Sequence, residues 1–106
     1  QHIIDTERIM AHRALWFARH HEAPLPGFDE DAFAQVATAF NRSIDSLAAE
    51  LMTVRAATRS LFLSFDTAAL AQSGVANNEP VTVLALGYII LGHWLHHQQV
   101  LTERYL

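Results

Sequence analysis

The chain has 106 residues, of which seven are Arg or Lys and eleven are Asp or Glu, so its net charge at neutral pH is -4. This length allows one domain, and a hydrophobic content of 51% is typical of a folded protein rather than a disordered one. All seven basic residues are Arg, spread along the chain, which argues against nucleic-acid binding and against docking on an anionic membrane. The lack of Cys excludes disulfides and Cys-ligated zinc.

The N-terminal residues bear on where in the cell the protein is found. Asp5, Glu7 and Arg8 lie where a signal peptide would have its apolar core, and no run reaches the roughly 18 apolar residues of a membrane span. We therefore expect a cytoplasmic protein without a membrane partner. The chain opens in a helical pattern without Met or a capping residue, so we also expect a further segment upstream.

Helical spacing of apolar residues dominates the first two thirds of the chain. It predicts a helix over 1–21, ended by Pro24 and Pro26, and then a loop over 21–28. Asp29 is the expected N-cap of a short helix over about 30–40, and Ser43 that of a long helix over about 44–65. The predicted buried stripe of these two helices comprises Phe33, Val36, Phe40, Ile44, Leu47, Leu51, Val54, Thr58, Leu61 and Phe65.

The last third begins with Asp66 as the expected cap of one further turn through Leu70. Gly74 and Asn77-Asn78 predict a loop over 72–80, and Pro80 is suited to the first turn of a last helix. The predicted buried side of that helix comprises Val83, Leu84, Leu86, Ile90, Leu91, Trp94, Leu95 and Leu101. Three long helices with short connections suggest an up-and-down bundle, in which a fourth helix from upstream or from a partner chain would cover the remaining apolar surface.

The seven histidines give the sharpest functional signal. His93 and His97 are four residues apart, so on a helix their imidazoles lie on one face and can reach one metal ion. No Glu follows His93, so the helix lacks the general base of a zinc metalloprotease. The alternative is that both histidines hydrogen-bond backbone or water near a helix end.

A third ligand has to come from another helix, and His2 is the candidate. The alternative for His2 is a solvated residue at a chain start. The remaining four histidines carry no such pattern, and we expect them to be solvated or at a surface: His12, His20, His21 and His96.

Two segments resemble the DinB/YfiT-like superfamily of metal-binding proteins. Residues 2–8 are similar to the H-x-x-D-x-E segment of its second helix, and residues 86–105 to its last helix, written G-H-x-x-H-H. Residues 25–33 and 54–58 fit the loop and third helix of that family. The resemblance implies an all-α fold, a DinB-like up-and-down four-helix bundle whose first helix is absent from this chain, with residues 1–106 forming a single, partial domain.

The resemblance also implies a site and an activity. Three histidines of such proteins bind a divalent metal ion, and they correspond to His2, His93 and His97. Zinc and nickel are the metals that the resemblance implies; histidine ligands suit zinc, nickel, copper and iron alike, so ligand type does not choose among them. Better-understood relatives are thiol-dependent transferases, using bacillithiol, mycothiol or a similar small thiol, and maleylpyruvate isomerases, and they are often dimers.

We therefore expect a homodimeric, metal-dependent transferase that joins a low-molecular-weight thiol to a small electrophilic substrate. The alternatives are a non-catalytic, stress-associated metal-binding protein and a dimeric structural protein with empty histidines. Asp5 is expected to orient a metal-bound imidazole, in preference to Glu7. Candidates for receiving a substrate carboxylate are Arg8, Arg13 and Arg55.

Overall fold

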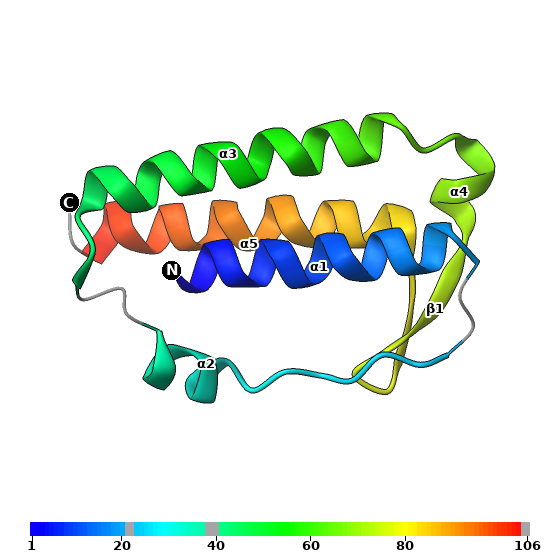
Figure 1. Ribbon diagram of the computed structural model, residues 1–106, viewed down its shortest axis with the longest axis horizontal. Helices are drawn as coiled ribbons and strands as arrows, with labels where there is room; N and C mark the ends of the chain where they lie inside the picture. Colours follow the sequence, from blue (N-terminus) through cyan, green and yellow to red (C-terminus); the bar gives the residue numbers. More distant parts are fainter. Residues whose placement is uncertain (21–22, 38–40, 105–106) are drawn as a thin grey trace.

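The structure is a computed structural model that describes residues 1–20, 23–37 and 41–104. It is predominantly helical, with one two-stranded sheet among the described residues (Figure 1). In chain order the elements are α1 (His2–Ala18), α2 (Glu30–Val36), α3 (Ile44–Leu63), α4 (Thr67–Ala71), β1 (Ser73–Ala76), β2 (Glu79–Thr82) and α5 (Val83–Arg104). The predicted all-α fold is confirmed, with the small sheet as an addition.

The three long helices lie side by side along the longest axis of the molecule (Figure 1). Helix α1 packs against both α3 and α5. It runs antiparallel to α5, as expected for neighbours in the bundle, but in the same direction as α3. The reason is the connection between α1 and α3, which includes α2 and returns along the length of the molecule.

Side-chain caps fix where the middle helices begin, as the sequence predicted. A carboxylate oxygen of Asp29 accepts hydrogen bonds from the backbone N–H groups of Asp31 and Ala32 at the start of α2. The Ser43 hydroxyl accepts one of 3.0 Å from the backbone of Ser46 in α3. Asp66 accepts one of 2.8 Å from the backbone of Ala69 in α4. The ends are less predictable. Helix α1 stops at Ala18, because His20 takes a positive φ of 62° that ends a right-handed helix. Part of the predicted short helix, residues 38–40 with Phe40, lies outside the described residues.

The prediction of a loop over 72–80 and a helix from Pro80 is wrong. Residues 73–76 and 79–82 pair as an antiparallel hairpin, with Pro80 opposite Val75. Asn77 and Asn78 form its turn with φ of 52° and 64°, the left-handed conformation that two-residue hairpin turns require and Asn tolerates. Helix α5 therefore starts only at Val83, where the Thr82 hydroxyl accepts a hydrogen bond from the backbone of Ala85 at 3.0 Å.

The core lies where the C-terminal half of α1 meets the start of α5 and the hairpin. Its largest fully buried side chains are Phe17, Val83 and Leu86. The hairpin approaches α1 closely at Gly74, where a Cβ atom would lie 2.3 Å from the Phe17 ring. The wholly buried members of this cluster are Ala14, Phe17, Ala18, Phe65, Ala76, Val83 and Leu86.

Much of the predicted buried surface is exposed. Val54, Thr58 and Phe65 of the first stripe are buried, whereas Val36 and Ile44 are 81% and 79% exposed. Phe33 of α2 is likewise exposed. So are four leucines predicted on the buried side of α5: Leu84, Leu91, Leu95 and Leu101. A helical pattern shows which residues share a face, but a face is buried only where a neighbouring element covers it.

The uncovered apolar surface includes a groove between α3 and α5 with a volume of about 580 Å³. Its walls are apolar apart from a few polar side chains, and no Asp or Glu lines it: Arg55, Thr58, Arg59, Phe62, Leu63, Leu70, Leu84, Gly87, Tyr88, Ile90 and Leu91. No helix in the described part of the chain is long and apolar enough to cross a membrane.

Candidate metal centre

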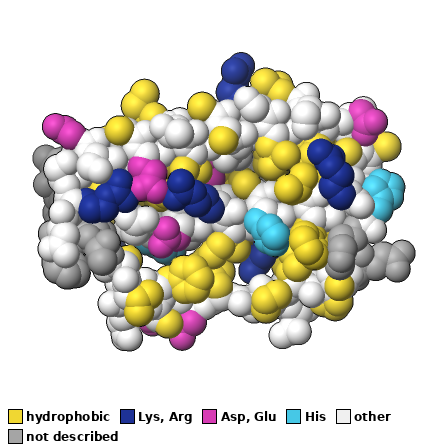
Figure 2. Space-filling view, in the orientation of Figure 1, with side chains coloured by type: hydrophobic (Ala, Val, Ile, Leu, Met, Phe, Trp, Pro, Cys, Tyr) yellow, Lys and Arg dark blue, Asp and Glu magenta, His cyan; other side chains and the backbone are white. Residues whose placement is uncertain are grey.

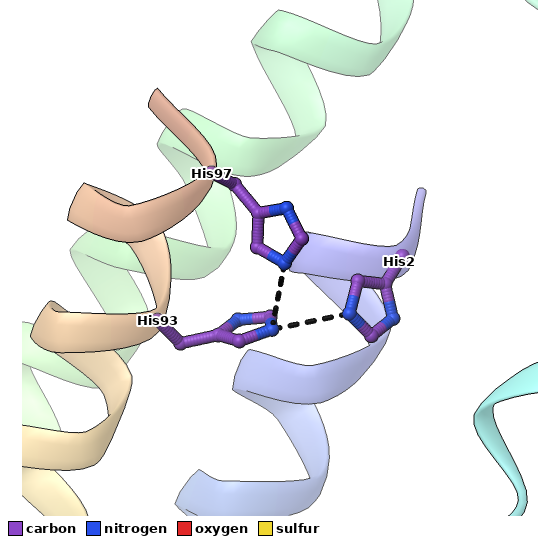
Figure 3. Close-up of side chains that lie close together, drawn as sticks. All are labelled: His2, His93 and His97. Atoms are coloured by element: carbon purple, nitrogen blue, oxygen red, sulfur yellow. Dashed lines mark hydrogen bonds between the residues drawn. The ribbon is translucent and has the colours of Figure 1, made fainter. Parts of the chain in front are cut away.

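Three histidines from two helices meet at the end of the bundle opposite the hairpin. His2 is the first residue of α1, and His93 and His97 lie one turn apart on α5. Because α1 and α5 run antiparallel, the start of one lies beside the later half of the other. Figure 3 shows the three imidazoles turned toward one another. The structure thus brings together the three residues that the sequence singled out.

The spacing of the ring nitrogens suits a metal ion. The Nε2 atom of His93 lies 3.1 Å from that of His2 and 3.1 Å from that of His97. One ligand atom from each of the three rings lies within 4.8 Å of the others. Metal–nitrogen bonds of about 2.0–2.1 Å at angles of about 90–109° place ligand nitrogens about 2.8–3.4 Å apart. The two distances from His93 lie in this range, so the cluster has the spacing of a divalent-cation site.

Hydrogen bonds alone satisfy this arrangement poorly. An imidazole nitrogen either carries a proton and donates or is bare and accepts through one lone pair. The Nε2 atom of His93 has two nitrogen neighbours at 3.1 Å, so it can satisfy only one of them well. A cation accepts a lone pair from all three nitrogens at once, which removes the conflict.

The surroundings keep two of the imidazoles neutral. Burial lowers the pKa of His93, and the positive charges that His97 and His2 would carry lower it further. Burial also lowers the pKa of His97, again with contributions from neighbouring histidines. The carboxylate of Glu30 opposes both shifts without reversing them. A neutral imidazole is the form that binds a metal, so these shifts favour ligation.

The partner of His2 is Thr6, not Asp5 as we expected. The Thr6 hydroxyl, which is buried, lies 3.5 Å from Nδ1 of His2, one turn along α1. That contact favours Nε2 as the atom of His2 that faces the cluster. Asp5 instead accepts a hydrogen bond of 3.0 Å from the Gln1 side chain. The sequence analysis does not identify the Thr6 hydroxyl, although Thr6 lies four residues from His2 and such a spacing places two side chains on one helix face.

Gln1 connects this end of α1 to α3. The Gln1 side-chain oxygen accepts a hydrogen bond of 3.0 Å from Arg42, and Arg42 also donates to Glu50, which pairs with Arg8. Figure 2 shows basic and acidic side chains lying together on this face, near the N-terminal end of α1. The network fixes the first turn of α1, and with it the backbone of His2.

A buried ion pair connects α1 to α3 further along α1 from His2. Glu7 is only 2% exposed, and both its oxygens accept hydrogen bonds from Arg55 of α3, at 2.8–3.1 Å. The Arg55 guanidinium also lies over the Trp94 ring at 5.7 Å, next to His93. Glu7 thus connects α1 to α3 through a buried ion pair.

The three arginines considered as carboxylate receptors all have partners within the chain. Arg8 pairs with Glu50 and Arg55 with Glu7. Arg13 is buried and donates to the backbone oxygen of Pro26 at 3.0 Å. A substrate carboxylate would therefore have to compete with an existing partner at each of them.

Three other histidines lie in the described part of the chain, and none of them belongs to the cluster. His12 is exposed beside Trp16, and His20 is exposed after the end of α1. His96 is exposed, although its ring lies 5.3 Å from that of His97. His21 lies outside the described residues.

A sequence profile of the DinB superfamily matches residues 1–101. The chain belongs to the DinB superfamily. Comparisons with curated proteins and with solved structures found no match. Membership of the DinB superfamily agrees with the helical fold and gives the histidine cluster a family context, while the chemistry of the site has to be argued from its residues.

Proposed function

We propose that this DinB-superfamily protein binds a divalent metal ion through His2, His93 and His97 and uses it to transfer a low-molecular-weight thiol to a small electrophilic substrate. The convergence of the three Nε2 atoms supports the metal site. Three protein ligands leave coordination positions for an exchangeable molecule, which is the pattern of catalytic rather than structural sites. Zinc, nickel and iron all suit such a ligand set.

The chain's composition supports an external thiol. A bound divalent cation lowers the pKa of a coordinated thiol, so that the thiolate is available at neutral pH. The chain has no Cys, and the nucleophilic sulfur must come from a separate molecule. The three histidines would hold the metal ion, which when bound would supply the site for the thiol, and Thr6 and the Gln1 network keep His2 in place.

Metal content tests the first half of the proposal. Protein purified without a histidine tag should contain about one equivalent of a divalent metal by mass spectrometry, either as isolated or after incubation with zinc or nickel. The His93→Ala/His97→Ala variant should lose it. The matched control is His96→Ala, which removes an exposed histidine of the same helix and should keep the metal. A wild-type protein that takes up no metal would refute the site.

Thiol transfer tests the second half. The metal-loaded protein should accelerate the reaction of a small thiol with a chromogenic aryl halide, and the double variant should not. Bound metal without activity across a panel of thiols would favour the alternative, a non-catalytic metal-binding protein. An empty site in a folded protein would favour a structural role.

A further inference from the structure

Asp5 and Glu30 line the small hollow that also contains His2, and a third carboxylate, Glu7, lies on the same helix as His2; the three differ in their partners. Asp5 accepts a hydrogen bond from Gln1, and Glu7 is held by Arg55 on the side of α3. Glu30 makes no hydrogen bond or ion pair with any described residue. Among these three carboxylates, Glu30 is therefore the one whose charge no guanidinium or amide offsets.

Helix α2 places Glu30 against the cluster. Glu30 is the first residue of α2, whose backbone is fixed there by the Asp29 cap. Glu30 and His2 line the same small hollow between α1 and α2, with Phe28 and Phe33 also in its wall. The next acidic residue, Asp31, does not line this hollow.

The electric field of Glu30 also reaches α5. Its negative charge raises the pKa of His93 and of His97, against the larger lowering effect of burial. Glu30 thus shares a hollow with one ligand, His2, and its charge acts on the other two, His93 and His97. Three neutral imidazoles leave the two positive charges of a divalent cation uncompensated, so a nearby carboxylate stabilises the bound ion.

We infer that Glu30 is the charge-compensating carboxylate of the histidine site and that it selects a neutral, protic ligand, such as a thiol or water, over an anion. The inference rests on the proposed metal site. A carboxylate accepts a hydrogen bond from an S–H or O–H group and repels a ligand that arrives already charged. Glu30 is thereby a specificity-determining residue, which favours the thiol of the proposed reaction over carboxylate or halide ligands.

The test uses cobalt(II), whose visible absorption reports its ligands, and azide as the anionic probe. Against the wild type, Glu30→Gln should weaken cobalt affinity about three- to tenfold and tighten azide binding to the cobalt protein by a similar factor, since one unit charge is lost near the ion. Glu30→Asp keeps the charge and should restore most of both values. Asp31→Asn is the matched control and should behave as the wild type.

The outcomes separate this inference from the metal site itself. If the wild type binds cobalt and Glu30→Gln is indistinguishable from Asp31→Asn in both titrations, the role of Glu30 is refuted and the site stands. If Glu30→Asp fails to restore the values, charge is not the cause and the inference is also refuted. If the wild type binds no cobalt, both the inference and the proposed function fall. Glu30 is exposed, so thermal unfolding of the variants should match that of the wild type.

Discussion

Helix α5 has two apolar faces, of which one is buried and the other is largely exposed. The face toward α1 is closed: Val83 and Leu86 are buried, and one end of it carries His93 and His97. The face toward the groove is open, and Leu84, Tyr88 and Leu91 are 48%, 69% and 48% exposed. The two faces alternate along the same helix and draw on the same residue types. What separates them is the neighbour, because α1 covers one face and no described element covers the other.

The closed face shows how the site is supported. The apolar contacts at one end of α1 and α5 set the distance between the helices, and the ion pair of Glu7 with Arg55 ties α1 to α3. The three imidazoles meet toward the other end, where His2 contacts the buried Thr6 hydroxyl. A site built on two packed helices is held more precisely than one on loops.

The largest expected effect compares the two faces directly. Leu86→Ala should lower the free energy of unfolding by about 2–5 kcal/mol, because it leaves a cavity in the core. Leu84→Ala, two residues earlier on the same helix, should cost less than about 1 kcal/mol, since Leu84 is half exposed. Chemical denaturation measures both, with Leu86→Val as a milder variant if Leu86→Ala does not fold. Equal losses would contradict the comparison and show that the groove is covered in solution.

A smaller effect is expected at the boundary between the faces, where Arg55 borders the groove and binds Glu7. Arg55→Ala leaves the Glu7 carboxylate buried without a counter-charge and should destabilise the fold by about 2–3 kcal/mol. Arg59→Ala is the matched control: Arg59 lines the same groove but makes no ion pair with any described residue, and its loss should change stability by less than about 0.5 kcal/mol. If both variants unfold at the same denaturant concentration, the buried pair does not hold α1 to α3.

The smallest effect is the pH dependence of the metal-free protein. His93 and His97 have pKa values below their ordinary 6.5, so the unfolded chain binds protons more readily than the folded one. Stability should be complete above pH 6.5 and fall as the pH drops below it. The fall should be modest, because both rings are partly exposed to solvent. Denaturation of the chelator-treated protein between pH 7 and 5 measures it.

The control for that experiment is the His93→Gln/His97→Gln variant, whose stability should depend less on pH than that of the wild type. The His96→Gln variant should keep the pH dependence of the wild type. The Arg8 and Arg42 side chains lower the pKa of Glu50 below its ordinary 4.5, so that group contributes only at more acidic pH. A profile for the wild type that stays flat, or rises toward pH 5, would contradict the assignment of burial as the main cause of the histidine shifts.

The sequence by itself was sufficient for the local features of the fold. The caps Asp29, Ser43 and Asp66 and the helices they begin follow from side chains that bond to backbone groups two or three residues away. The pairing of His93 with His97 follows from helix periodicity, and His2 was found because its segment resembles the DinB-like one. The hairpin was missed, although Asn77-Asn78 carries its turn signal, because its strands are only four residues long.

Tertiary structure decided which helix faces are buried and which residues lie beside each carboxylate. Whether Leu84 or Leu86 is buried depends on the side from which α1 approaches α5, and no local pattern contains that direction. The same holds for three carboxylates that are alike in sequence. Glu7 pairs with Arg55 of α3, Asp5 accepts from Gln1, and Glu30 shares a hollow with His2. Burial and electrostatic interactions are set by distances between elements far apart in the chain, and only packing fixes those distances.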